Sequence, residues 1–545
     1  MSTENPEFKD YPPRSYKTVP ELALKENAHI SRADINSLLV TDERVHAPTD
    51  GSKIVEFLKG KKVFVTGGTG FIGKLLTEKL LRTCNVDTIY MLVRPKKGKN
   101  AESRLDDTFS DVIFSELDKV QPKFRHKCVA IKGDASLPEL GISQEDRQTL
   151  IKNVDVIYHV AATVRFDEII SLAASINVSG TKEMLLLAQQ CSKLCSMVHV
   201  STAYAHNPRK EIGEKFYDAA YTTDEILDMV AKHNDSYLEG NKKRILKGWP
   251  NTYSFTKAIA EYTVRTIGAG LPISIVRPGI ITSTYKEPLR SWIDNLYGPM
   301  GAIVGAGTGV LRSFNADPEK VSEIVPGDYV VNAILAASHA NILNKKGDIK
   351  IYNYVSSTEN PITWGDFHDM AVYYGLQNPT IKSIWYYCNR LNKNYYVHML
   401  SVFFLHFIPA FFIDAYLMVK GKKTRMVKIY TSIQKFSSTL ALFAVNEWKY
   451  TNDNTQALWN NLSPIDKKLF DFSLSQENFN WNSYISILGG GVRLYLLKDN
   501  METIPKAIKK YRKLYIYHKV FQGICLLVAL RVLFWIFGAI ISIFT

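Results

Sequence analysis

The sequence predicts an α/β fold, a Rossmann-type doubly wound parallel sheet, followed by a mainly α-helical C-terminal domain and a C-terminal transmembrane helix. Three observations support this prediction. Short apolar segments alternate with helix-patterned segments from about residue 60 onward, which is typical of a parallel sheet. A glycine-rich loop directly follows the first apolar segment and opens a helical pattern. The last 26 residues, 520–545, contain Arg531 as their only charge, and about 20 apolar residues suffice to cross a bilayer.

The N-terminal residues 1–58 are polar, contain prolines and show weak periodicity. We predict a flexible leader there, with one short helix near Ile54–Leu58. Residues 59–375 form the predicted α/β domain, whose first helix covers 71–82. Its strands are expected at 62–66, 88–93, 128–132, 154–158, 196–200 and 273–276.

Residues 376–518 change in character, because aromatic pairs crowd a region with few strand signals. This pattern favours a second, helical domain. Within it, residues 395–419 contain His398, His406, Pro409 and Asp414, so we expect a buried or membrane-surface helix pair rather than a span.

Residues 519–545 form the predicted membrane anchor. A central Arg costs about 2.5–3.5 kcal/mol on insertion scales, which the surrounding apolar residues can offset. Basic residues concentrate between Lys506 and Lys519, so the positive-inside rule places the body of the protein in the cytosol. The alternative is a helix that docks on the protein or lies in the membrane interface.

Composition limits the remaining possibilities. The net charge is +14, but no nucleic-acid-binding motif accompanies it, so we expect an anionic membrane surface or a phosphorylated substrate and no nucleic acid. The six cysteines show neither CxxC nor zinc spacing, which predicts a reduced compartment and no metal site. No apolar run follows the first methionine, so no cleavable signal peptide is expected.

The glycine loop has the spacing of a dinucleotide-binding turn. Gly67 permits the tight turn, Gly70 the close approach of a pyrophosphate, and Gly73 the packing of helix on strand. The helix N-terminus then attracts phosphate. The predicted cofactor-binding residues here are Thr66, Gly67, Thr69, Gly70, Phe71, Ile72 and Gly73. The alternative is a glycine turn without a ligand.

The end of the second strand indicates which cofactor binds. An acid at this position would bind a ribose 2′-hydroxyl, but the strand ends in Arg94, followed by Lys96. Because a guanidinium pairs well with a 2′-phosphate, NADPH is favoured over NADH. A solvated basic turn is the alternative. Asp134, after the next strand, is expected to reach the adenine or its ribose.

Tyr253 and Lys257 are four residues apart and therefore share one helix face. An ammonium near a phenol lowers the phenol pKa from about 10, so this tyrosine can protonate a carbonyl oxygen as hydride arrives at carbon. A hydroxyl partner is expected after a central strand. Thr202 is the first choice and Ser201 the second. The pair is also common on ordinary helix surfaces, and only the glycine loop favours catalysis.

This set resembles the extended short-chain dehydrogenase/reductase superfamily, and longer strings resemble the alcohol-forming fatty acyl-CoA reductases. The strings are His159–Glu168, Asn177–Thr181, Val276–Ile280, Lys286–Pro288, Trp292–Pro299 and Val304–Arg312. Within them, the resemblance assigns Ala161, Pro278 and Ile280 to cofactor binding. Gly279 stands where the family often has Ser, and Gly68 where it often has Ala.

The resemblance implies that a long-chain acyl-CoA is reduced through a bound aldehyde to a primary alcohol, with two NADPH consumed and CoA released. Lys257 would also bind the nicotinamide ribose, and the aromatic C-terminal domain would hold the acyl chain beside membrane lipid. Arg165, Lys286, Arg290 and Arg312 are candidates for CoA phosphates, or else are surface charges. A reductase of sterols or sugar nucleotides and a non-catalytic lipid-binding protein are the alternatives. Chain length, oligomeric state and the choice between endoplasmic reticulum and peroxisome stay open.

Overall fold

A seven-stranded parallel sheet forms the centre of the computed structural model, which describes residues 43–96, 98–344 and 347–544. The strand order is β12-β7-β5-β4-β1-β2-β3, and every neighbouring pair is parallel. The strands are β1 (Lys62–Thr66), β2 (Thr88–Val93), β3 (Cys128–Lys132), β4 (Val156–His159), β5 (Ser196–Val200), β7 (Ile273–Pro278) and β12 (Lys350–Tyr354). The predicted doubly wound sheet is thereby confirmed, and β12 is the strand that the sequence did not reveal.

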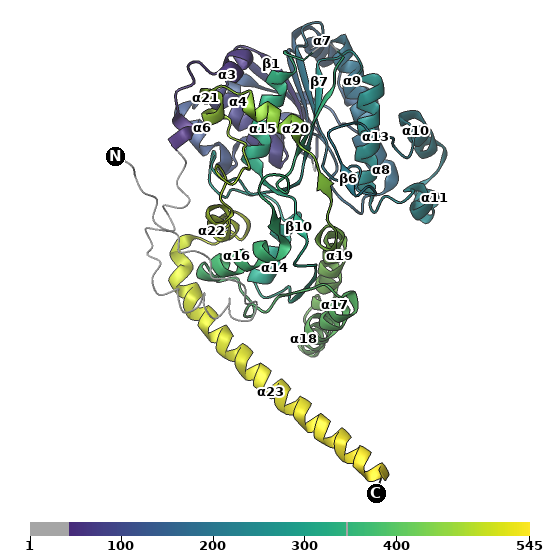
Figure 1. Ribbon diagram of the computed structural model, residues 1–545, viewed down its shortest axis with the longest axis vertical. Coiled ribbons are helices and arrows are strands. Elements are labelled where there is room, and N and C mark those ends of the chain that lie inside the picture. The colour runs from purple at the N-terminus through teal and green to yellow at the C-terminus, as the bar shows by residue number, and fades with distance from the viewer. Residues whose placement is uncertain (1–42, 97, 345–346, 545) are drawn as a thin grey trace.

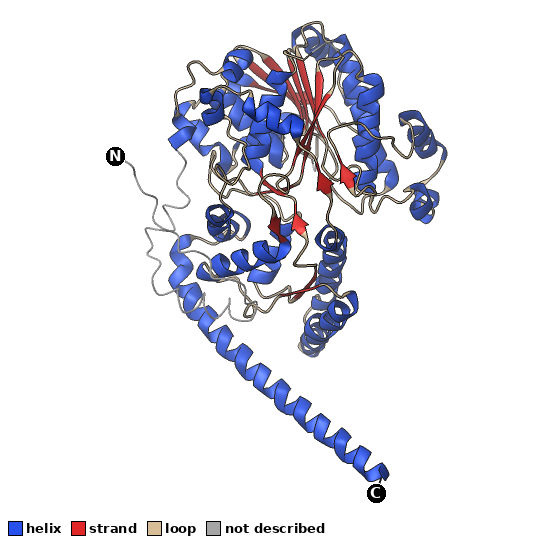
Figure 2. Ribbon diagram, in the orientation of Figure 1, coloured by secondary structure: helices blue, strands red, loops and turns tan. Residues whose placement is uncertain are grey.

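Helices cover both faces of this sheet (Figures 1 and 2). In β1, Val63 and Val65 share one apolar core with α4 and α15, whereas Phe64 joins a second core with α9 and α13. The strand order reverses between β1 and β4, and open α/β sheets bind their ligands outside the carboxyl ends of the strands at such a point. The helices of this layer are α3 (Lys53–Leu58), α4 (Phe71–Thr83), α5 (Ala101–Phe109), α6 (Ser115–Val120), α7 (Gln144–Asn153), α8 (Ile170–Ala174), α9 (Gly180–Gln190), α10 (Thr223–Lys232), α11 (Asp235–Gly240), α12 (Lys242–Ile245), α13 (Thr252–Ile267), α15 (Gly327–Ala340), α20 (Asp453–Asn460) and α21 (Pro464–Leu469).

A second group of helices lies beyond the carboxyl ends of the strands (Figure 1). They are α14 (Pro299–Gly307), α16 (Trp364–Gln377), α17 (Tyr395–Val402), α18 (Ile408–Val419), α19 (Met426–Val445), α22 (Trp481–Gly491) and α23 (Ile504–Phe544). Short strands connect this group to the sheet layer: β6 (Glu211–Ile212), β8 (Ile280–Thr282), β9 (Ser313–Asn315), β10 (Val321–Ser322), β11 (Ile324–Pro326), β13 (Ile362–Thr363), β14 (Arg390–Asn392) and β15 (Lys449–Tyr450). The expected boundaries at 375/376 and 518/519 fall inside α16 and α23, and the division into domains stays a prediction.

The end of the predicted leader is anchored to the body. The predicted short helix is confirmed as α3, and Ser52 caps it by accepting a hydrogen bond from the Val55 N–H. Ser52 Oγ also donates to Asp466 of α21 over 2.5 Å. The remainder of the predicted flexible leader, residues 1–42, lies outside the described residues.

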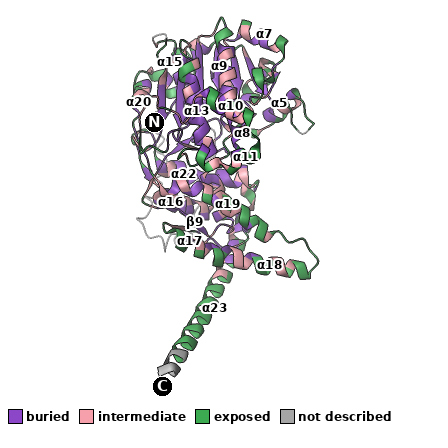
Figure 3. Cartoon of the chain, turned by 90° about the vertical axis from the view of Figure 1, so that its right-hand side faces the viewer, coloured by how far each residue is buried: buried purple, intermediate pink, exposed green. Residues whose placement is uncertain are grey.

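Two described segments are long and apolar enough to cross a membrane, Tyr395–Val419 and Met501–Gly538. The second comprises most of α23, a continuous helix about 60 Å long that leaves the body after its first three turns (Figures 1 and 3). The first comprises α17, a π-helical turn (Phe403–Phe407) and α18. Most of its apolar side chains are exposed. The sequence predicted either a buried helix pair or one at the membrane surface, and the buried alternative is wrong.

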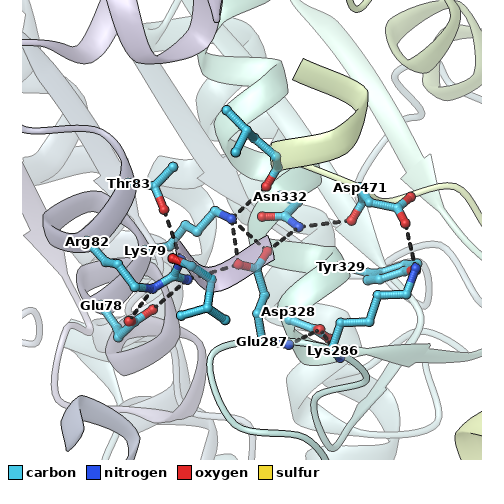
Figure 4. Close-up of polar contacts among 12 residues, drawn as sticks. Glu78, Lys79, Arg82, Thr83, Lys286, Glu287, Asp328, Tyr329, Asn332 and Asp471 are labelled. Atoms are coloured by element: carbon cyan, nitrogen blue, oxygen red, sulfur yellow. Dashed lines mark hydrogen bonds and ion pairs between the residues drawn. The ribbon is translucent and has the colours of Figure 1, made fainter. Parts of the chain in front are cut away.

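A buried polar network joins the sheet layer to the C-terminal segment (Figure 4). Glu287 accepts hydrogen bonds from Lys79 and Arg82 of α4, and Lys79 also donates to the Leu469 carbonyl. Lys286 donates to Asp471 over 2.7 Å. These contacts fix the loop after β8 on the helix that the glycine loop begins.

Candidate active site

One cavity of about 1430 Å³ extends from the carboxyl ends of the strands into the helical group. The glycine loop, the end of β2 and the start of α13 line one part of it. Side chains of α14, α16 and α19 line the other part. A single continuous cavity therefore connects the predicted cofactor site with the aromatic C-terminal region.

The glycine loop leaves room for a pyrophosphate only because its glycines lack side chains. Gly67 has a φ of +74°, and a Cβ there would lie 2.7 Å from the Ala161 nitrogen. A Cβ on Gly73 would collide with the Gly67 carbonyl. Gly70 is the N-cap of α4 and has no side chain to cap the helix, so the first N–H groups of α4 point toward the cavity end. These features fit a dinucleotide.

Three basic side chains lie at the end of the cavity next to the carboxyl end of β2. Arg94, Lys96 and Arg104 all line it. Arg94 lies 3.5 Å from a carboxylate oxygen of Asp134, and the Arg104 guanidinium donates to the Arg94 carbonyl. The sequence reasoning missed Arg104, since this residue lies on α5, eleven residues after the end of β2. The cluster has the charge and the guanidinium geometry that suit a 2′-phosphate.

Tyr253 and Lys257 lie on α13, and both face the cavity. Asn251 begins the helix, because its side chain accepts the Ser254 N–H. The expected lowering of the phenol pKa is wrong for this structure: burial raises the pKa of Tyr253 to about 12, against a smaller opposing effect of the hydrogen bond with Thr202. The physical reason is that burial disfavours the charged phenolate. Lys257 Nζ donates to the Val200 carbonyl over 2.7 Å. Burial lowers the pKa of Lys257 itself to about 8, although Glu261 opposes this.

The two candidate hydroxyls have different partners. Thr202 shares a hydrogen bond with Tyr253, whereas Ser201 Oγ donates to Glu261 over 2.5 Å. Glu261 is buried and also binds Arg277 and His206, with N–O distances of 2.6 and 2.9 Å. Although burial opposes them, the interactions with Arg277 and His206 hold the pKa of Glu261 far below its usual range. Ser201 therefore belongs to a buried ionic network, and Thr202 faces Tyr253.

Asn177 orders the loop that follows β4, and the sequence reasoning gave it no role. It lies in a π-helical turn, Ser175–Ser179, between α8 and α9. Its side chain accepts the Thr163 N–H over 2.9 Å and donates to Thr256 Oγ1 over 2.9 Å. Loop 160–168, which lines the cavity, is thereby tied to α13. Asn177 belongs to the string Asn177–Thr181 noted in the sequence. The spacing of residues in the sequence does not predict where a side chain in a π-helical turn points.

The cavity wall includes nearly all the predicted site residues. They are Gly67, Thr69, Gly70, Phe71, Ile72, Gly73, Arg94, Asp134, Ala161, Ser201, Thr202, Tyr253, Lys257, Pro278 and Ile280. Thr66 is not among them, since its hydroxyl bonds His159 and accepts the Ala161 N–H behind the loop. Gly279 is required by packing, because a Cβ there would collide with the Glu323 carbonyl.

The four candidates for CoA phosphates lie in different places. Arg165 lines the cavity and is exposed. Lys286 pairs with Asp471 in the network of Figure 4. Arg290 donates to the Tyr285 carbonyl, and Arg312 donates to the Leu405 carbonyl. Only Arg165 of these four is part of the cavity wall.

Comparison with known proteins gives consistent matches along the chain. Family models described as male sterility protein match residues 65–334 and 405–499. Fatty acyl-CoA reductase wat of Drosophila melanogaster is 43% identical over 469 residues, covering 86% of this chain and 90% of that protein. Human fatty acyl-CoA reductase 1 is 37% identical, covering 85% and 89%. Bovine fatty acyl-CoA reductase 2 is 34% identical, covering 88% and 93%.

Solved structures share the fold at low identity. The terminal R domain of the myxalamid biosynthetic pathway superposes with a TM-score of 0.54 at 19% identity, covering 85% of this chain and 97% of that one. The reductase domain of a nonribosomal peptide synthetase from Mycobacterium tuberculosis gives 0.53 at 19% identity, covering 88% and 99%. These likenesses support the architecture of the sheet and its helical extension.

Proposed function

The chain belongs to the fatty acyl-CoA reductase family, and on that premise we propose that it reduces a long-chain fatty acyl-CoA to the primary alcohol with two NADPH, releasing CoA. The observation that carries this proposal is the single cavity, which joins Tyr253 and Thr202 to a long apolar chamber. A reductase of small polar substrates has no need of such a chamber.

The apolar wall begins beside the catalytic tyrosine. The Phe166 ring lies 5.7 Å from that of Tyr253 and 5.1 Å from that of Phe443, and Trp364 donates to the Phe443 carbonyl. From Trp364 the wall follows α16 to Leu376, about 18 Å at the helical rise of 1.5 Å per residue. This length and lining suit an extended acyl chain, whose burial is favoured in proportion to the apolar area removed from water.

The glycine loop would hold the cofactor, and Arg94, Lys96 and Arg104, which line the same cavity, would bind its 2′-phosphate. When bound, the reduced nicotinamide supplies hydride to the acyl carbon. Lys257 is positioned to donate to the nicotinamide ribose, because its ammonium reaches the cavity beside the end of β5. The basic cluster favours NADPH over NADH.

In the first reduction, Tyr253 and Thr202 donate hydrogen bonds to the thioester oxygen as it becomes an oxyanion. Re-formation of the carbonyl then breaks the carbon–sulfur bond, CoA leaves as the thiolate, and the aldehyde stays in the cavity. In the second reduction, Tyr253 transfers its phenolic proton to the alkoxide and gives the alcohol. Solvent returns that proton to the tyrosinate. Burial raises the pKa of the phenol further above neutral pH, so Tyr253 carries its proton when the alkoxide forms.

We further propose that α23 crosses the membrane and that the body faces the cytosol, at the endoplasmic reticulum or the peroxisome. The supporting features are the apolar exposed surface of α23 after residue 519 and the basic residues that precede it.

The test is product analysis with the full-length protein in detergent micelles, supplied with palmitoyl-CoA or stearoyl-CoA and NADPH. We expect the primary alcohol and free CoA, with two NADPH oxidised per alcohol. Aldehyde as the end product would refute the two-step proposal. Tyr253→Phe should lower turnover by about 10²–10⁴, the usual contribution of a positioned proton donor, while NADPH binding measured by fluorescence is retained. Oxidation of NADPH by this variant at the wild-type rate would contradict the role of Tyr253.

A further inference from the structure

The segment α17–α18, with the π turn Phe403–Phe407 between the two helices, projects an apolar surface away from the body; we call it the limb. Tyr396 is 81% exposed and Val419 is 85% exposed. The other exposed apolar side chains are Tyr395, Val397, Leu400, Phe403, Phe404, Leu405, Phe411, Phe412, Ile413, Tyr416 and Met418. A contiguous surface of this size is unusual for a protein in water and marks a membrane or protein contact.

The chain enters and leaves the limb on the same side. Before it, β14 pairs with β9 of the body. After it, Asp414 accepts the N–H groups of Arg425, Met426 and Val427, which fixes the start of α19 on α18. The returning helix α19 carries Lys428, Gln434 and Lys435 and packs on β9, so it is no membrane span. A crossing would leave the two ends on opposite sides, which this arrangement forbids.

The limb and α23 are held in one frame. Arg312 connects them, since its guanidinium donates to Leu405 in the limb over 2.8 Å and lies 5.9 Å from the centre of the Trp385 ring. Trp385 in turn donates to His518 of α23 over 3.1 Å and packs against Phe521. Figure 3 shows α23 leaving the body downward, while α18 projects sideways across that direction. If α23 crosses a bilayer, the limb therefore lies along its surface.

Charge at the limb's tip favours an anionic surface. Lys420, Lys422, Lys423 and Arg425 are exposed in the loop that joins α18 to α19. Basic residues near a bilayer that contains anionic lipid each contribute about 1 kcal/mol of attraction. An aromatic and aliphatic helix face beside a basic loop is the pattern of an interfacial membrane helix.

We propose that the limb is a second membrane attachment, which lies in the headgroup layer of an anionic bilayer while α23 crosses it. The occupant of the apolar surface is lipid. Two attachments at fixed mutual orientation stop the body from rotating about a single anchor. They also hold the end of the cavity that α23 lines through Tyr511 against the membrane. This inference goes beyond the reductase chemistry and does not depend on it, but it rests on the proposed crossing of α23.

The test uses the full chain in vesicles of equal parts phosphatidylcholine and phosphatidylserine. A Phe412→Cys variant, in a Cys525→Ser background, carries an environment-sensitive fluorophore, and quenching is measured with nitroxide lipids labelled near the headgroup or deep in the acyl chain. We expect stronger quenching by the shallow nitroxide than by the deep one. The matched control is Tyr237→Cys in the same background, an exposed tyrosine on α11, for which we expect no quenching.

The other outcomes of the quenching experiment and a charge-reversal variant test the separate parts of the proposal. An unquenched fluorophore at position 412 would place the limb in water, and stronger quenching by the deep nitroxide would make it a span. In the same labelled protein, K420E/K422E/K423E should reduce shallow quenching in the anionic vesicles. If the triple variant and its labelled parent are quenched equally in vesicles of phosphatidylcholine alone, this would confirm that charge attracts the tip. An unchanged signal in the anionic vesicles would refute the role of charge. The parent Cys525→Ser protein, treated with the same dye, corrects for labelling of other thiols.

Discussion

Replacing Glu287 by glutamine should destabilise the fold strongly without changing the cavity. Lys79 Nζ lies 2.6 and 2.7 Å from the two Glu287 oxygens, and Arg82 lies 2.9 Å from one of them. Asn332 donates a further hydrogen bond over 3.1 Å. All these groups are buried and connect α4 to the loop after β8 (Figure 4).

The magnitude follows from the pKa of Glu287. Burial alone would raise it, but Lys79 and Arg82 outweigh burial and lower the pKa from 4.5 to about 2. A difference of about 2.5 corresponds to roughly 3 kcal/mol of stability at neutral pH. Because the pKa is lower in the folded state, this contribution is complete above pH 4.5 and is lost as the pH falls toward 2. The Glu287→Gln variant lacks this stabilising contribution at every pH. At neutral pH the expected loss is in line with the about 3–5 kcal/mol that breaking a buried ion pair costs.

The assay is urea unfolding of the detergent-solubilised full chain, followed by tryptophan fluorescence. At pH 7 we expect the free energy of unfolding of Glu287→Gln to be about 3 kcal/mol below wild type, and the gap to narrow as the pH falls below 4.5. Glu211→Gln is the matched control, since Glu211 pairs with Lys449 at the surface, and its effect should stay below about 1 kcal/mol. Equal effects of the two substitutions at pH 7, or a gap that does not change with pH, would refute the reasoning.

Three further predictions concern the active site. Arg94→Ser should raise the KM for NADPH by about 10- to 100-fold, which is the equivalent of one charged hydrogen bond, and should change the KM for NADH little. An unchanged KM for NADPH in steady-state kinetics would contradict this prediction. Burial lowers the pKa of Lys257 to about 8, so the wild-type kcat/KM should fall as the pH rises through 8. An active Lys257→Arg variant should show no such fall. A wild-type kcat/KM that stays constant up to pH 10 would show that catalysis does not require a cationic lysine. Thr202→Val should lower kcat more than Ser201→Ala, since Ser201 already donates to Glu261; the reverse order would make Ser201 the substrate partner.

The strands could be predicted because a strand that is buried on both faces consists mainly of apolar residues. Lys62–Thr66, Thr88–Val93, Cys128–Lys132 and Ser196–Val200 were predicted at the residues where the structure has them. The last strand, β12, was not, because Lys350–Tyr354 contains Asn353 and Lys350 among its apolar residues. Asn353 is buried there because its side chain donates to backbone carbonyls of other segments. Such partners are invisible in a sequence.

The same distinction explains the site. The glycine loop, Tyr253 and Lys257 are local patterns, so their shared location on the cavity wall could be predicted from spacing. Arg104 reaches the cofactor end from a neighbouring helix, and Lys286 turns away from it to pair with Asp471. Both outcomes depend on contacts between distant segments.

The tyrosine shows how a correct pattern led to a wrong electrostatic inference. Spacing of four residues places Lys257 one turn from Tyr253, but the ammonium is bonded to the Val200 carbonyl, and burial dominates the phenol. In the proposed reaction, a phenol with a pKa of about 12 would stay protonated through the first reduction, where a hydrogen bond to the oxyanion suffices. Transfer of its proton at that stage would give the neutral hemithioacetal, which releases CoA less readily. The second reduction forms an alkoxide, which is a stronger base than the tyrosinate and takes the proton. In the proposed mechanism, one weakly acidic donor can therefore serve both reductions, and the role proposed for Lys257 is to position the nicotinamide ribose.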